Sequence, residues 1–124
     1  MKKILIAEDD KFLASAYRVK LTKAGFEVQI ASDGNEAIAL LKTFTPDLIL
    51  LDLMMPTKDG FSTLQDLKAN DLWKNIPVIV ASNLGQKEDM EKSRALGATD
   101  FVVKSDLSLD ALIEKINKLL EVTA

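Results

Sequence analysis

The chain has 124 residues, and its 16 basic and 19 acidic side chains give a formal net charge of -3 at pH 7. This length suits one domain with a single core, which we place at residues 1–124, and no basic stripe of the kind that binds nucleic acid is present. The chain contains no cysteine and no histidine, which excludes disulfides, thiol catalysis and imidazole chemistry. No apolar stretch approaches membrane-spanning length, and we expect a cytoplasmic protein that does not contact a membrane.

The predicted elements alternate between strands and helices from the N-terminus onward. A short apolar strand is expected at about residues 3–7, and a helix follows that begins near Lys11 and ends at Gly25, which is placed to cap it. Residues 26–30 alternate between apolar and polar, which indicates a half-exposed strand at the edge of a sheet. Asp33 is then placed to cap the start of a second helix.

The second half of the chain continues this alternation, with expected strands at about 47–51, 78–81 and 101–103 and helices after Gly60, at about 86–96 and after Ser108. The continuous apolar runs in several strands indicate burial on both faces. Strict alternation calls for parallel strands joined by right-handed helical crossovers. We therefore expect an α/β fold: a doubly wound, five-stranded parallel sheet of order 2-1-3-4-5 with five helices, as in flavodoxin-like proteins.

Polar side chains follow four of these strands: Glu8 and Asp9 the first, Asp52 the third, Ser82 the fourth and Lys104 the fifth. With that sheet order the first and third strands are neighbours at the topological switch point, where ligands bind. Carboxylates crowded together repel one another unless a cation or protons intervene, which favours a hard divalent metal such as Mg²⁺. Three carboxylates, a hydroxyl and a lysine also suit phosphoryl transfer, with a carboxylate as nucleophile.

Each of these residues has an ordinary explanation when it is taken alone. A single strand-end Asp is usually a turn residue, a single lysine is usually solvated and a single serine is usually a loop hydroxyl. Five such residues at the carboxyl ends of four strands favour a common site. Mononucleotide binding is a poor alternative, because the expected phosphate loop after the first strand carries acids instead.

The sequence resembles the receiver domain of two-component response regulators, in the single-domain form of the chemotaxis regulators. The resemblance covers Lys2 to about Leu120. It rests on the Glu8-Asp9 pair, PDLILLDLMMPTKDG (Pro46 to Gly60), PVIVAS (Pro77 to Ser82) and GATDFVVK (Gly97 to Lys104).

The resemblance implies that Asp52 accepts a phosphoryl group from the phosphohistidine of a sensor histidine kinase or a phosphotransfer protein. It also implies a Mg²⁺ site formed by the side chains of Asp9 and Asp52 and the backbone carbonyl of Met54. Glu8 would act partly through water. Such a protein is a signalling phosphoacceptor that assists its own phosphorylation rather than an enzyme in the usual sense.

In the same way, Ser82 matches the family's switch hydroxyl, Lys104 its lysine and Phe101 its switch aromatic. Phosphorylation would then change the face formed by the helix at about 86–96, the fifth strand and the last helix. The resemblance implies an unidentified downstream protein target on this face and a phosphorylation-dependent homodimer, with no direct nucleic-acid binding by this domain.

The sequence departs from the family pattern after Lys104. Ser105 follows Lys104 where the family has proline, and a cis bond before a non-proline residue costs about 2.5–4 kcal/mol. We therefore expect a trans, differently shaped loop.

Two apolar residues, Met54 and Leu84, border the path that a water molecule would take to attack the aspartyl phosphate. This predicts slow dephosphorylation.

The alternative function is that of a receiver-fold interaction module that works without phosphorylation, although such a module would need none of the site residues together.

Overall fold

The computed structural model of the chain describes residues 2–83, 87–105 and 108–123, and it contains one parallel sheet of order β2-β1-β3-β4-β5. The strands are β1 (Lys3–Ala7), β2 (Glu27–Ala31), β3 (Leu48–Asp52), β4 (Val78–Ser82) and β5 (Asp100–Val103). The helices are α1 (Lys11–Lys23), α2 (Gly34–Leu41), α3 (Gly60–Ala69), α4 (Lys87–Ala95) and α5 (Leu109–Thr123). The predicted doubly wound fold, its strand order and its five helices are confirmed.

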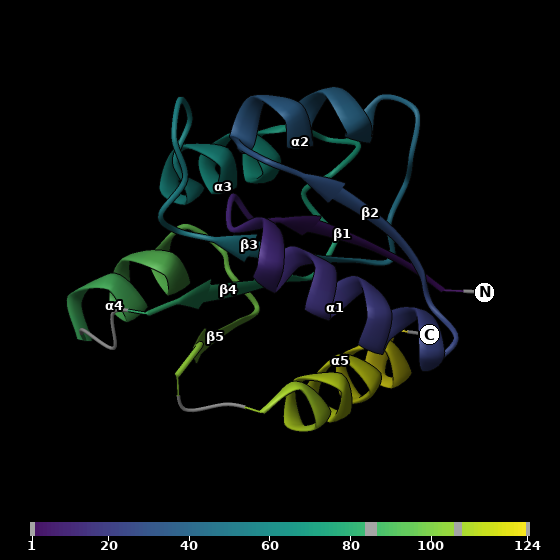
Figure 1. The fold of residues 1–124 in the computed structure, drawn as a ribbon. Coiled ribbons are helices and arrows are strands. Elements are labelled where there is room, and N and C mark those ends of the chain that lie inside the picture. Colours follow the sequence, from purple (N-terminus) through teal and green to yellow (C-terminus); the bar gives the residue numbers. More distant parts are fainter. Residues whose placement is uncertain (1, 84–86, 106–107, 124) are drawn as a thin grey trace.

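The core forms two layers, one on each face of the sheet. Successive side chains of a strand point to opposite faces. Ile4 and Ile6 therefore pack with α1 and α5, whereas Leu5 and Ala7 pack with α2 and α3. Figure 1 shows the same division, with α1 beside α5 and α2 beside α3. Burial on both faces explains why the inner strands are continuous apolar runs, while β2 at the edge is half exposed as predicted.

Side-chain caps fix where the helices begin, so that the connections at the carboxyl edge of the sheet are well defined. Asp10, Asp33 and Asp59 each accept hydrogen bonds from backbone N–H groups in the first turn of α1, α2 and α3. The Ser108 hydroxyl accepts one from the first turn of α5 at 3.1 Å. Gly25, at φ 97°, follows the end of α1 in the left-handed region that favours glycine. These caps confirm the predicted helix starts at Lys11, after Asp33 and after Ser108.

Two inner strands run one residue further than the sequence pattern predicts. β3 ends at Asp52 and β4 at Ser82, because Asp52 pairs with Ala81 and Ser82 pairs with Val103 in the register of the sheet. Both polar residues are therefore fixed by strand pairing rather than by a loop. The helix expected from about Gln86 begins at Lys87 among the described residues, and Gln86 itself lies outside them. No helix in the described part of the chain is both long and apolar enough to cross a membrane.

Candidate functional site

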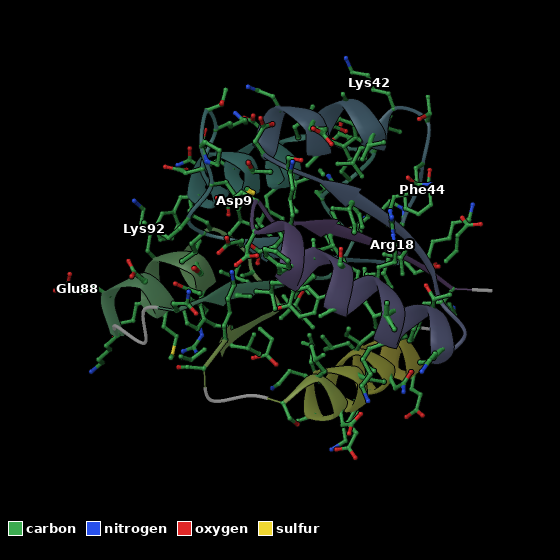
Figure 2. The ribbon with its side chains drawn as sticks, in the orientation of Figure 1. Asp9, Arg18, Lys42, Phe44, Glu88 and Lys92 are labelled. Carbon is green, nitrogen blue, oxygen red and sulfur yellow. The ribbon has the colours of Figure 1, made fainter. Side chains whose placement is uncertain are left out.

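Three carboxylates meet at the carboxyl edge of the sheet. β1 and β3 are paired neighbours, so that Glu8 and Asp9, just past β1, lie beside Asp52 at the end of β3. One oxygen of each carboxylate lies within 4.8 Å of the others. Glu8 is 3% exposed and Asp52 4% exposed, whereas Asp9 is exposed; Figure 2 labels it on the connection from β1 to α1. An all-oxygen donor set of this kind fits a hard divalent cation such as Mg²⁺.

Lys104 reaches the two buried carboxylates from the end of β5. Its ammonium lies 2.5 Å from Glu8 Oε1 and 3.2 Å from Asp52 Oδ1. Its backbone N–H donates to the Ser82 carbonyl at 2.8 Å, which fixes the end of β5 against the end of β4. Every peptide bond among the described residues is trans, including the one before Ser105, as expected. The lysine is therefore part of the cluster without the proline of the family pattern.

Burial and charge together determine the protonation of this cluster. Burial is the main cause that raises the pKa of Glu8 to about 7, and the negative charge of Asp52 adds to it, while the hydrogen bond from Lys104 opposes it. Burial alone would lower the pKa of Lys104, but the hydrogen bond to Glu8 and the charge of Asp52 outweigh it, so that this pKa is raised. A bound divalent cation would stabilise the Glu8 carboxylate and lower its pKa again.

The cluster opens into two adjoining hollows. The first has a volume of about 260 Å³ and is lined by Glu8, Asp9, Asp10, Leu13, Asp52, Met54, Asn83 and Lys104. The second has a volume of about 600 Å³ and is lined by Asp9, Leu53, Met54, Met55, Pro56, Asp59, Phe61, Ser82 and Asp89. Asp9 and Met54 border both, so that an ion or phosphoryl group beside Asp52 would have access to either hollow.

The predicted site residues are thus brought together, with one exception. The carboxylates, Met54 and Lys104 share the first hollow, and the fully buried Ser82 lines the second. Phe101 is partly buried on the α2 and α3 side of the sheet and lines a separate small hollow with Met90 and Arg94 of α4. Phe101 therefore packs against the core, and it also lies next to α4, so that a change in α4 would alter its surroundings.

Three further residues complete the surroundings of the cluster. Asp10 caps α1, and its backbone N–H donates to Glu8 Oε2 at 3.2 Å. The buried Tyr17 lies near the acids, and burial is the main cause that raises its pKa to about 12. Asn83 lines the first hollow. In the sequence Asp10 belongs to the same acidic run as Glu8 and Asp9, and its place directly before a helix start indicates a cap. Tyr17 and Asn83 were not predicted, because a core-spaced tyrosine and a loop asparagine carry no signal of a functional site.

The family of this protein follows from its similarity to known proteins. The family model for the response regulator receiver domain matches residues 4–117, and the chain therefore belongs to the response regulator receiver domain family of two-component systems. Members of this family act as signalling phosphoacceptors and partner with histidine kinases or phosphotransfer proteins.

Individual relatives agree with this assignment. The chain is similar to the DNA-binding dual master transcriptional regulator RpaA of Synechocystis, at 36% identity over 99% of this chain and 51% of that protein. It is also similar to the transcriptional regulatory protein CpxR of Klebsiella pneumoniae, at 40% identity over 94% of this chain and 49% of that protein. It therefore spans about half the length of these relatives.

Two solved structures are also similar to this chain. The receiver domain of the Francisella response regulator 1452 has a TM-score of 0.92 and 35% identity, with both chains fully covered. The Mn²⁺-bound form of response regulator Rcp1 has a TM-score of 0.78 and 33% identity over 90% of this chain and 86% of that one.

Proposed function

We propose that Asp52 is the phosphoacceptor of this receiver domain and takes the phosphoryl group from the phosphohistidine of a sensor histidine kinase or a phosphotransfer protein. The observation that carries the proposal is the buried Asp52 carboxylate, which lies beside two further carboxylates and 3.2 Å from the Lys104 ammonium. A phosphorylation-independent module would have no need of this arrangement, in which buried like charges must be held together.

The donor set supports Mg²⁺ as the cofactor. Asp9, Asp52 and the Met54 carbonyl would hold the ion directly, and Glu8 would act partly through water. When bound, the ion would neutralise charge on the phosphoryl oxygens during transfer. The Mn²⁺-bound state of the similar regulator Rcp1 adds support for a divalent metal.

The contacts of Asp52 orient its carboxylate for attack. The Lys104 ammonium at 3.2 Å and the Met54 N–H at 3.3 Å both contact Oδ1. We therefore assign the attack to Oδ2, which forms the new O–P bond while the N–P bond to the donor imidazole breaks. Lys104 places a positive charge where phosphoryl oxygens accumulate, and the Ser82 hydroxyl would donate a hydrogen bond to one of them.

The aspartyl phosphate should be long-lived. Hydrolysis needs a positioned water, and Met54, which is 63% exposed at the rim of both hollows, is apolar and cannot orient one. Leu84, to which the same expectation applies, lies outside the described residues. We expect a Met54→Asn variant to lose its phosphoryl group severalfold faster than the wild type after the donor is removed; equal or slower loss would contradict this account.

Phosphorylation by a small donor tests the proposed function. Incubation with acetyl phosphate and Mg²⁺ should give one phosphoryl adduct in the intact mass, and chelation of Mg²⁺ should greatly slow its appearance. Asp52→Asn should remain unlabelled, whereas a folded Lys20→Met variant, which loses only an exposed ion pair with Asp110, should be labelled like the wild type. Equal labelling of Asp52→Asn would show that the assignment is wrong, and no labelling of the wild type would favour the phosphorylation-independent module.

A further inference from the structure

The connection between β3 and α3 contains a tight turn with a strained backbone. The Lys58 N–H donates a hydrogen bond to the Pro56 carbonyl at 2.6 Å, and Thr57 between them has φ 67°. A hydrogen bond across one residue of positive φ is a γ-turn of the rare, strained type. A β-branched residue is an outlier in this region. Such a turn persists only when the surrounding structure holds it.

Lys58 connects this turn to two helices. Its carbonyl accepts a hydrogen bond from the Gly34 N–H, at the start of α2, at 3.1 Å. Its ammonium lies 2.6 Å from Asp66 Oδ2 and 3.2 Å from Ser62 Oγ, both on α3. The Lys58 side chain is 19% exposed, so that the ion pair is partly shielded from solvent. Figure 1 shows this connection rising beside the N-terminal end of α2.

The same connection contains Met54, which lies beside the carboxylate of Asp52. At its base the Gly60 N–H donates to the Leu53 carbonyl at 3.0 Å, and the Met54 N–H donates to Asp52 Oδ1 at 3.3 Å. Met54 therefore lies between two anchors, the hydrogen bond at the base and the contacts of Lys58 beyond the turn. Because few residues separate Met54 from the turn, a displacement of the turn would be passed to it.

We infer that Lys58 is a positioning residue, which holds the strained turn at Thr57 against α2 and α3 and thereby keeps Met54 in place for the metal and for Asp52. The inference rests on the proposed Mg²⁺ site. Lys58 acts through the backbone of the connection and not as a nearby positive charge. Removing its acidic partner Asp66 should therefore have the same effect as removing Lys58, whereas a purely electrostatic role predicts opposite effects.

Mg²⁺ binding to the unphosphorylated protein tests the inference without any readout of phosphorylation. The dissociation constant can be measured from amide NMR shifts during a Mg²⁺ titration. We expect Lys58→Met and Asp66→Asn each to raise it by about tenfold, at the lower end of what residues outside the direct ligands contribute. Lys58→Arg should retain near wild-type binding. Lys74→Met is the matched control, because it removes an exposed ion pair with Asp71 in a different loop, and it should bind like the wild type.

A double-mutant cycle with Thr57→Gly separates support of the strained turn from a general loss of packing. Glycine adopts positive φ freely, so that Lys58→Met should cost clearly less affinity in the Thr57→Gly background. An equal cost in both backgrounds, or unchanged binding in Lys58→Met and Asp66→Asn, would overturn the inference. In that case Mg²⁺ binding by the wild type would leave the proposed function intact, whereas a wild type that does not bind Mg²⁺ would contradict both.

Discussion

At the scale of single residues, the cluster brings ionisable side chains together in a buried place. Glu8 and Asp52 are almost fully buried beside each other, and Lys104 contacts both. Burying a charge without a partner is costly. The lysine supplies one positive charge against two or three carboxylates, which leaves a site that favours a further cation. A divalent cation at this edge of the sheet would offset this excess of negative charge.

Tyr17 gives a prediction for alkaline pH. Its pKa is raised to about 12 by burial first and then by the charges of Glu8, Asp52 and Asp10, against an ordinary value of 10. The neutral phenol therefore favours the folded state: this contribution is complete below pH 10 and is lost as the pH rises through 12. Between pH 9 and 11.5, the wild type should lose about 1–2 kcal/mol more of its free energy of unfolding than Tyr17→Phe, measured by urea denaturation. Equal losses would contradict the raised pKa.

At the scale of elements, the start of α3 lies very close to the end of β3. A Cβ on Gly60, the first residue of α3, would overlap the Asp52 carbonyl and the Leu53 Cα. We expect Gly60→Ala to shift one of these elements, to cost about 1–3 kcal/mol of stability and to slow phosphorylation by acetyl phosphate. Denaturation and intact mass measure the two effects.

Gly25→Ala is the control for that prediction. Gly25 has φ 97° but nothing within 4 Å of an added Cβ, and it lies between α1 and β2. Its substitution should destabilise the protein through backbone strain without changing the phosphorylation rate. Slowing of both variants in proportion to their loss of stability would show that the close approach of Gly60 to Asp52 has no special role.

For the proposed function, we expect the output at the face formed by α4, β5 and α5. Lys104 and Ser82 lie at the ends of β5 and β4, and an ion pair of 2.7 Å between Asp100 and Lys115 connects β5 to α5. A phosphoryl group on Asp52 would therefore shift the conformation of this face, because it would act on Lys104 and Ser82 at the ends of β5 and β4. We expect amide NMR shifts in α4, β5 (Phe101 included) and α5 when a phosphoryl mimic binds. Changes confined to the metal pocket would contradict a switch at this face, and with it the homodimer or target expected there.

Most of the fold could be predicted from the sequence, because the pattern of each strand and helix reflects its own burial. The apolar run before Asp52 and the cap at Asp33 are local signals, and both were confirmed. The ends of β3 and β4 were not predicted correctly, because they depend on pairing with distant strands. The strained turn at Thr57 and the anchors of Lys58 carried no local signal, since their geometry is set by α2 and α3.

At the scale of the whole molecule, Mg²⁺ should stabilise the fold. The cation relieves repulsion that exists only when the carboxylates are brought together by folding, so that it binds the folded state preferentially. A tenfold excess of Mg²⁺ over its dissociation constant should add about 1.4 kcal/mol and raise the melting midpoint by a few degrees. Asp9→Asn should show a smaller rise. An unchanged midpoint of the wild type at millimolar Mg²⁺ would count against the site.

Chemical trapping of the phosphoryl group shows directly whether Asp52 is its acceptor within the whole chain. The chain can be phosphorylated with acetyl phosphate and Mg²⁺, reduced with borohydride, which converts an aspartyl phosphate to homoserine, and then digested for peptide mass spectrometry. We expect homoserine at position 52 in the peptide that spans β3, and no modification elsewhere. Homoserine at position 9 or another acid, or a phosphate on a hydroxyl that borohydride leaves unchanged, would contradict it.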